Sequence, residues 1–463
     1  MQTFAIHVLG CRVNHYEGEQ IATLLRRRGL RQVTDAREAD LCVVHTCSVT
    51  REAAAKSGQA VRRATRLPVL THATTGLPVR GRRRTVVTGC WAASNPGAVA
   101  GIEGVDAVLG HETDVAAGLE RVLAEAALGP VAPSPDTVVT PTVGGTFALP
   151  LLGDARQSGQ QRAYLKVQDG CDAHCTYCII PRLRPALWSK PVDACVEEAR
   201  RLVDAGHREI VLTGIFLGAF GRSTALRRRQ VAGPSPVAPL AHLIEALCSR
   251  VPGLRRLRCS SLEPGDLTPT LIDVLRSYAQ VVPHFHLPLQ SGSDAILRRM
   301  NRQYRRDDYV RMLDRVTDAF DRPALTTDVI TGFPGESDAD FAATLEVVDR
   351  ARFIHVHAFP FSARPGTAAA RWGRQFVPAA VASERVATLK SRGEAHSEAF
   401  RRQFLGQTVE ILVERPKHPT RRHGRCERYF EVAVEDAVQL SAGQAVAVRV
   451  AEVDGRRTAG VLA

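Results

Sequence analysis

The chain contains the sequence Gly170-Cys171-Asp172-Ala173-His174-Cys175-Thr176-Tyr177-Cys178-Ile179-Ile180-Pro181, in which three cysteines have the spacing C-x3-C-x2-C. Three thiolates this close in sequence can ligate three irons of a four-iron cluster. No fourth cysteine follows at ferredoxin spacing, so one iron would stay open to a substrate. A zinc site is the alternative, but zinc prefers four ligands in paired sets, and the nearby fourth candidate is His174.

The composition is that of a large, basic, globular chain. It has 463 residues, of which 44% are apolar, and a formal net charge of +13. This length predicts about three domains, and the positive charge favours an acidic partner such as nucleic acid. No run of about eighteen apolar residues could span a membrane, and Met1 to Leu9 is typical of a strand and not of a signal peptide. The 11 cysteines therefore indicate metal or redox use in the cytoplasm instead of a disulfide framework.

The N-terminal residues 1–125 predict an open parallel α/β domain. Short apolar runs each precede a helical pattern, at 3–9, 41–46 and 85–88. Cys11, Cys47 and Cys90 follow these runs in turn. Because ligands in such folds collect outside the carboxyl ends of the strands, we expect the three thiols to meet there. Cysteines that merely pack in the core are the alternative for any one of these positions.

A helix start signal follows Cys11. In Asn14-His15-Tyr16-Glu17 the spacing is that of a capping box, with Asn14 as N-cap and Glu17 at the third helical position. A role for this segment beside the strand-end thiols is the alternative. Farther along, residues 126–160 have no apolar period and are rich in proline and glycine, which predicts a linker.

Residues 161–395 predict a partial (β/α)6 barrel that is open on one side. Six strands alternate with helical patterns, at 163–168, 209–213, 256–260, 284–289, 325–331 and 354–359. Barrels of this kind carry their chemistry at the carboxyl ends of the strands. The C-x3-C-x2-C run follows the first strand, and Thr213-Gly214, Glu263 and Gln290 follow the next three. Polar residues that merely line the barrel rim are the alternative for Glu263 and Gln290.

The C-terminal residues 396–463 predict a small β-barrel, with strands at 407–414, 428–434 and 444–452. Basic and aromatic side chains gather in its middle, namely Arg421, Arg422, Arg425, Arg428, Tyr429 and Phe430. Charge and stacking faces in this combination favour single-stranded RNA. A solvated basic hairpin is the alternative.

Several motifs resemble those of the methylthiotransferases, a family of radical S-adenosylmethionine enzymes. The segments that resemble its N-terminal domain are Leu9-Gly10-Cys11-Arg12-Val13-Asn14, His45-Thr46-Cys47-Ser48-Val49-Thr50 and Val87-Thr88-Gly89-Cys90-Trp91-Ala92. The cysteine run with Tyr177, the strand ends of the barrel and the C-terminal strands resemble its radical SAM barrel and its TRAM module. Two departures are His45, where the family usually has asparagine, and residues 182–191, where Pro185 replaces a glycine and Trp188 a basic residue.

The resemblance implies two [4Fe-4S] clusters, one held by Cys11, Cys47 and Cys90 and one by Cys171, Cys175 and Cys178. It implies that the loop from Thr213-Gly214 binds the methionine amino group of S-adenosyl-L-methionine, and that Glu263 and Gln290 contact the same cofactor. By the same resemblance, one S-adenosylmethionine would methylate a sulfur at the first cluster, and a second would yield a 5′-deoxyadenosyl radical that removes hydrogen from carbon 2 of an adenine. A flavodoxin- or ferredoxin-like electron donor and a sulfur source are the further partners implied.

The implied substrate is a tRNA adenosine beside the anticodon. The run Thr213-Gly214-Ile215-Phe216-Leu217-Gly218-Ala219-Phe220-Gly221 resembles the branch that acts on N-threonylcarbamoyladenosine, although Phe216 stands where that branch often has histidine. A threonylcarbamoyl carboxylate needs a cation, and Arg182 and Arg184 near the barrel rim are candidates. The alternatives are a methylthiotransferase for isopentenyladenosine or for an aspartate of a ribosomal protein, and a non-catalytic iron-sulfur RNA-binding protein.

Overall fold

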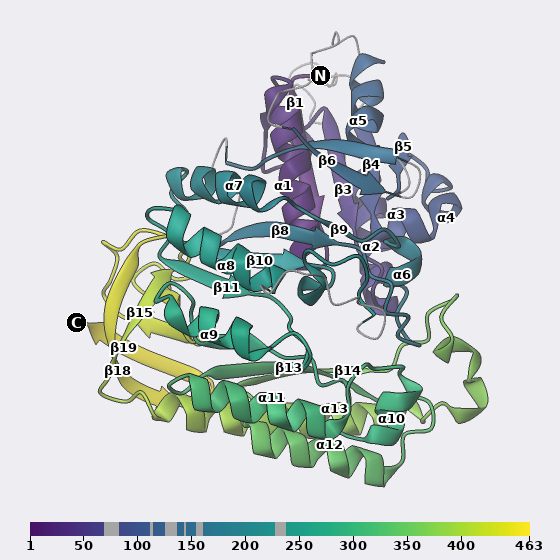
Figure 1. Ribbon diagram of the computed structural model, residues 1–463. Helices are drawn as coiled ribbons and strands as arrows, with labels where there is room; N and C mark the ends of the chain where they lie inside the picture. Colours follow the sequence, from purple (N-terminus) through teal and green to yellow (C-terminus); the bar gives the residue numbers. More distant parts are fainter. Residues whose placement is uncertain (69–82, 112–113, 126–136, 143–144, 154–160, 227–237) are drawn as a thin grey trace. The chain divides into compact units, whose positions relative to one another are not determined.

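The computed structural model describes residues 1–68, 83–111, 114–125, 137–142, 145–153, 161–226 and 238–463 (Figure 1). The chain divides into two compact units. Unit 1 comprises Met1–Ala155, Asp169–Asp172 and Cys178–Trp188. Unit 2 comprises Arg156–Gln168, Ala173–Tyr177 and Ser189–Ala463. None of the described helices is both long and apolar enough to cross a membrane.

Unit 1 contains a five-stranded parallel sheet with the order β2-β1-β3-β4-β5. Its strands are β1 (Thr3–Val8), β2 (Arg31–Gln32), β3 (Leu41–Thr46), β4 (Arg84–Gly89) and β5 (Ala107–Leu109). Its helices are α1 (Arg12–Arg27), α2 (Arg51–Arg66), α3 (Cys90–Ser94), α4 (Pro96–Ala100) and α5 (Val115–Ala124). The open parallel α/β fold predicted from the sequence is confirmed.

Both faces of this sheet are covered, which explains why β3 is apolar along most of its length. Leu41 and Val43 belong to a core cluster with residues of α1 and α5. Cys42 and Val44 alternate with them and belong to a second cluster with residues of α2 and α4. Cys42 is therefore a core residue.

The start of α1 differs from the predicted capping box. The helix begins at Arg12 with Cys11 as its N-cap, so Asn14 lies inside the first turn. Nδ2 of Asn14 donates to the carbonyl oxygens of Leu9 at 2.7 Å and Thr46 at 3.0 Å. The capping-box prediction is wrong, because Cys11 and not Asn14 is the N-cap. The side-chain amide of Asn14 instead holds the ends of β1 and β3 together beside Cys11.

Part of the segment 126–160, for which no regular element was expected, forms an antiparallel hairpin. Its strands are β6 (Thr137–Thr142) and β7 (Gly145–Pro150). The carbonyl oxygen of Pro150 accepts a hydrogen bond of 3.0 Å from Nε2 of Gln20 in α1. The hairpin is therefore tied to the helix that follows Cys11.

Unit 2 contains the predicted series of parallel strands. One sheet has the order β11-β10-β8-β9 and another the order β12-β13-β14. Parallel bridges from Leu257 to Val281 and from Ser261 to His286 connect the two sheets. The strands are β8 (Ala163–Asp169), β9 (Trp188–Ser189), β10 (Glu209–Gly214), β11 (Arg256–Cys259), β12 (His284–His286), β13 (Ala324–Thr331) and β14 (His355–Pro360). The partial barrel is confirmed, with the short β9 as an addition.

Helices separate these strands as predicted (Figure 1). They are α6 (Ile180–Leu183), α7 (Val192–Asp204), α8 (Pro239–Arg250), α9 (Pro269–Ser277), α10 (Asp294–Arg299), α11 (Arg306–Ala319) and α12 (Asp338–Ala351). Cys195 in α7, Cys248 in α8 and Cys259 in β11 are buried core cysteines.

The long helix α13 (Ala379–Arg402) leads to a closed five-stranded barrel with the order β15-β16-β17-β19-β18. Its strands are β15 (Thr408–Val413), β16 (Arg422–Cys426), β17 (Glu431–Val434), β18 (Ala445–Asp454) and β19 (Arg457–Leu462). The small barrel was predicted, but β16 and β19 were not. The strand expected from Arg428 begins only at Glu431, because Tyr429 has a φ of +72° in the preceding turn.

Candidate active site

Three cysteines lie at the carboxyl edge of the unit 1 sheet. Cys11 follows β1, Cys47 follows β3 and Cys90 follows β4, and these strands are neighbours. A Cβ atom on Gly10, whose φ is +107°, would lie 2.6 Å from Cβ of Cys47. Only glycine permits both this conformation and this approach. The fold thus brings together three cysteines that are far apart in sequence.

The buried thiol of Cys90 interacts electrostatically with those of Cys11 and Cys47. Burial raises the pKa of Cys90 to about 12; the charge of Arg184 opposes this rise, and the charges of Cys11 and Cys47 add to it. Nε2 of His111 lies 3.4 Å from Sγ of Cys90. Thiols bind a metal as thiolates. A cation with affinity for sulfur would compensate the negative charge of three thiolates at this edge. Three gathered sulfurs fit an iron-sulfur cluster with one open iron.

Arg184 closes this edge with a buried ion-pair network. Its Nη1 and Nη2 donate to Oε1 and Oε2 of Glu17, both at 2.7 Å, and Nη1 also donates to Oδ2 of Asp169 at 2.8 Å. Oε2 of Glu17 lies 3.2 Å from Nε2 of His45. The carbonyl oxygen of Arg184 accepts from the backbone N–H of Cys171 at 3.0 Å. Two carboxylates of the chain therefore already bind Arg184, one of the two arginines considered as a cation for a substrate carboxylate.

The cysteine run lies in the loop after β8, where Cys171, Cys175 and Cys178 are partly exposed. Around Cys175 the loop is fixed to the turn 299–302. The backbone N–H of Thr176 donates to the carbonyl oxygen of Met300 at 3.1 Å, and its hydroxyl donates to that of Arg299 at 2.8 Å. His174 has a φ of +47°, which is uncommon for a residue with a Cβ.

Arg302 is a site residue that sequence analysis missed. Its Nη1 donates to Sγ of Cys175 at 3.2 Å and to the hydroxyl of Tyr177 at 3.4 Å. Its Nη2 forms an ion pair with Oε1 of Glu263, and its guanidinium lies 4.9 Å from the ring centroid of Tyr304. Arg302 therefore places a positive charge directly beside Sγ of Cys175. In the sequence nothing distinguishes Arg302 from the many other arginines.

Glu263 is thus held by Arg302. Thr213 and Gly214, the candidate cofactor-binding residues after β10, lie as follows. Thr213 is buried at the end of β10. A Cβ on Gly214 would lie 3.0 Å from Oε1 of Gln168, an atom that accepts from the backbone N–H of Phe216 at 2.8 Å.

Gln290 stands in a strained conformation, with a φ of +62°. Its backbone N–H donates to the carbonyl oxygen of Asp328 at 2.8 Å, and its carbonyl oxygen accepts from Ile330 at 3.0 Å. Such conformations cost about 1–3 kcal/mol and occur often at functional sites. Cys175, Thr213, Glu263 and Gln290 all follow or end strands of one parallel series, at its carboxyl edge.

Three residues expected to face RNA, Arg428, Tyr429 and Phe430, pack inside unit 2 instead. Phe430 is 6% exposed in the core of the C-terminal barrel. Tyr429 stacks on His284 with ring centroids 4.5 Å apart, and the guanidinium of Arg258 lies 4.9 Å from its ring. Nε of Arg428 donates to the carbonyl oxygen of Arg322 at 3.1 Å. Tyr429, Phe430 and Arg428 therefore join the two barrels of unit 2, and the stacking surface predicted for them is wrong.

Other basic side chains of the C-terminal barrel point into solvent. Arg415, Lys417, Arg449 and Arg456 are exposed. Arg421 lies 3.5 Å from Glu435, and Arg422 donates to backbone carbonyls of its own barrel. A polyanion would thus meet charge on this barrel, without the aromatic faces that the sequence suggested.

Three protein-family models match successive parts of the chain. Residues 3–110 match the model described as "Uncharacterized protein family UPF0004", 165–348 the Radical SAM superfamily, and 402–459 the TRAM domain. These matches follow the N-terminal sheet, the partial barrel and the C-terminal barrel in turn.

Two curated proteins are similar over most of their length. Threonylcarbamoyladenosine tRNA methylthiotransferase MtaB of Bacillus subtilis (strain 168) is 34% identical over 89% of this chain and 85% of that protein. The tRNA-2-methylthio-N(6)-dimethylallyladenosine synthase of Erythrobacter litoralis (strain HTCC2594) is 34% identical over 95% of this chain and 94% of that protein. Among solved structures, the radical S-adenosylmethionine methyltransferase TsrM of Kitasatospora setae covers 80% of this chain and 77% of its own, with a TM-score of 0.52 and 13% identity. That structure shares the fold.

Proposed function

The chain belongs to the radical S-adenosylmethionine tRNA methylthiotransferase family, and we propose that it transfers a methylthio group to carbon 2 of N-threonylcarbamoyladenosine next to the anticodon of tRNA. The family implies a [4Fe-4S] cluster and S-adenosyl-L-methionine. Relatives named for threonylcarbamoyladenosine and for dimethylallyladenosine are equally identical to the chain, at 34%. The choice of substrate therefore depends on the residues.

One observation carries this choice, and it concerns the loop after β10. Leu217 is 1% exposed, and the backbone N–H of the preceding Phe216 is held by Gln168. The isopentenyladenosine branch more often has asparagine in place of Leu217. An asparagine side chain buried here would need hydrogen-bond partners for its amide. The burial of the apolar Leu217 therefore supports the threonylcarbamoyladenosine branch.

We assign the radical cluster to Cys171, Cys175 and Cys178. When bound, such a cluster supplies the electron that cleaves S-adenosylmethionine. The chain's own contribution is to hold the ligands and tune their charge: Arg302 donates to Sγ of Cys175, and Glu263 holds Arg302 in place. Thr213, Gly214 and Gln290 are the further candidates for cofactor contact at this edge.

We assign a second cluster to Cys11, Cys47 and Cys90, which would carry the sulfur to be methylated. A carbon-hydrogen bond of an adenine ring has no acid or base route to sulfur, which is why a radical is needed. Cys90 and Cys47 are buried, whereas Cys11 is exposed at the open side of this edge. The electron donor is flavodoxin- or ferredoxin-like, the sulfur source is a separate donor, and the reaction takes place in the cytoplasm.

The proposal is tested with the anaerobically reconstituted enzyme, S-adenosylmethionine, a reductant and three tRNAs. The tRNAs carry threonylcarbamoyladenosine, isopentenyladenosine or unmodified adenosine at the same position, and products are identified by nucleoside mass. We expect methylthio product from the first tRNA alone, and none from a Cys175→Ala enzyme. Turnover of the isopentenyl tRNA alone would overturn the substrate and leave the enzyme class intact.

A further inference from the structure

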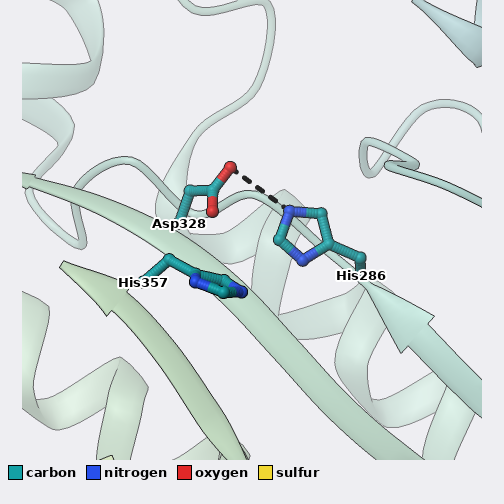
Figure 2. Close-up of side chains that lie close together, drawn as sticks. All are labelled: His286, Asp328 and His357. Atoms are coloured by element: carbon teal, nitrogen blue, oxygen red, sulfur yellow. Dashed lines mark hydrogen bonds and ion pairs between the residues drawn. The ribbon is translucent and has the colours of Figure 1, made fainter. Parts of the chain in front are cut away.

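A separate group of ligand-type side chains lies on β12, β13 and β14. His286 ends β12, Asp328 lies in β13 and His357 lies in β14. The register of β13 and β14 places Asp328 directly opposite His357. Directly opposed residues of neighbouring strands point to the same face. Figure 2 shows the three side chains converging there.

This face is the one turned away from the helices. Along β14 the buried residues Val356 and Ala358 alternate with the exposed His355 and His357. Val356 packs against α13, since a Cβ on Gly393 of that helix would lie 3.3 Å from its side chain. His357 and Asp328 therefore face the inner side of the partial barrel and are open to small ligands.

The spacing of the three side chains suits a single metal ion. One ligand atom from each residue lies within 4.8 Å of the others. Nε2 of His286 and Oδ2 of Asp328 are 3.2 Å apart. Ligands that sit about 2.0–2.2 Å from one ion at tetrahedral or octahedral angles are separated by roughly this distance.

The histidines also have the outer partners that metal ligands use. Nδ1 of His286 lies 2.9 Å from the hydroxyl of Thr326, which leaves its Nε2 directed at Asp328. Nδ1 of His357 lies 3.1 Å from Nε2 of His355. In metal sites a hydrogen bond to the second ring nitrogen of a ligating histidine fixes the ring; here a hydroxyl and a second imidazole occupy that position.

A second group of possible metal ligands, Glu414, His423 and Glu431, differs because basic side chains lie beside its carboxylates. Glu414 lies 3.2 Å from Nε of Arg425, and Glu431 lies 3.5 Å from Nζ of Lys417. Its carboxylates are already neutralised by side chains of the chain. Of the two groups found among the described residues, His286, Asp328 and His357 are the better candidate for metal binding.

We infer that His286, Asp328 and His357 form a binding site for one divalent transition-metal ion, distinct from the cysteine sites. Two imidazoles and one carboxylate are ligands that Zn²⁺, Fe²⁺ and Mn²⁺ accept, and three protein ligands leave positions for an oxygen donor. An ion on this face would supply a cation for a substrate carboxylate, whereas Arg184 is already bound by Glu17 and Asp169. That role rests on the proposed function, whereas the binding of the ion does not.

Zinc provides the direct test, because its X-ray absorption edge is separate from that of iron. The anaerobically reconstituted protein is loaded with one equivalent of Zn²⁺ and passed through a desalting column. We expect about one retained zinc per chain, with nitrogen and oxygen neighbours at about 2.0–2.1 Å and none at the Zn–S distance of about 2.3 Å. A sulfur shell, or no retained zinc, would overturn the inference.

Variants locate the ion. Asp328→Ala and His357→Ala should lose the retained zinc, while His242→Ala, at an exposed histidine of α8, should keep it. Thr326→Val, which removes an outer partner only, should weaken zinc binding about 10–100-fold. Retention by Asp328→Ala would place the zinc elsewhere and refute the site. Because the wild-type spectrum needs no variant and no tRNA, its outcome is independent of folding defects and of the proposed substrate.

Discussion

Arg302 is the side chain whose removal should change the radical cluster without removing a ligand. Its Nη1 donates to Sγ of Cys175 at 3.2 Å, and the charge is buried, with 7% of the side chain exposed. Hydrogen bonds to cluster sulfurs are one of the levers that set reduction potential. A positive donor stabilises the reduced, more negative cluster, so Arg302→Met should lower the potential.

The size of the shift follows from this one bond. A hydrogen bond to a charged group contributes about 1.5–3 kcal/mol. For a one-electron couple, 59 mV corresponds to a tenfold change in equilibrium constant, or about 1.4 kcal/mol. If the whole contribution belongs to the reduced state, the potential falls by about 65–130 mV. The carboxylate of Glu263, left behind without Arg302, acts in the same direction.

The assay is a redox titration of the reconstituted protein, followed by the electron paramagnetic resonance of the reduced cluster. The background is a Cys11, Cys47 and Cys90 to Ala variant, so that one cluster gives the signal. Arg299→Met is the matched control, because this arginine is in the same turn but lies over Trp372, 5.1 Å from its ring. A potential that stays unchanged in Arg302→Met, or rises, would refute the reasoning.

Other perturbations have equally defined outcomes. The Cys11, Cys47 and Cys90 to Ala variant should still cleave S-adenosylmethionine when reduced but yield no methylthio product, as measured by chromatography and mass; normal product would show that sulfur comes from elsewhere. Arg184→Met removes the buried cation shared by Glu17 and Asp169, which costs about 3–5 kcal/mol and should lower the melting temperature by about 6–20 °C, while Arg37→Met at an exposed pair should not; equal melting curves would contradict the network. Burial raises the pKa of Glu209, but Arg258 and two further arginines outweigh it and hold the pKa below its usual value. The stability gained over Glu209→Gln should therefore be full above about pH 4.3 and be lost as the pH falls below it; a gain that persists in acid would contradict the pairing. Substitution of exposed Lys417 and Arg449 by alanine should weaken tRNA binding and reduce its salt dependence, with unchanged affinity at all salt concentrations as the contrary result.

Most of the fold was accessible from the sequence because its strands are short, apolar and regularly spaced. The alternation of Leu41, Cys42, Val43 and Val44 between two cores is what a doubly covered parallel strand requires. The placement of Cys11, Cys47 and Cys90 at one edge followed from that topology alone. The β6–β7 hairpin was missed because its prolines and glycines resemble those of a linker, and its contact with α1 is long-range.

The polar partners were much less predictable. Arginine is so common in this chain that Arg302 and Arg184 carry no local signal, and their roles depend on residues more than 100 positions away. Tyr429 beside arginines resembled an RNA-stacking motif, but the same combination packs between two barrels. Composition and spacing reveal which chemistry is present, whereas burial decides which charges remain available.

The central claim is the identity of the modified nucleoside, and the tRNA of a strain that lacks this gene tests it most directly. Its nucleosides are released enzymatically and measured by mass, beside strains complemented with the wild-type chain and with Cys175→Ala. The account predicts that 2-methylthio-N-threonylcarbamoyladenosine disappears, that N-threonylcarbamoyladenosine accumulates, and that only the wild-type chain restores the product. Loss of 2-methylthio-isopentenyladenosine instead, or an unchanged nucleoside profile, would contradict it.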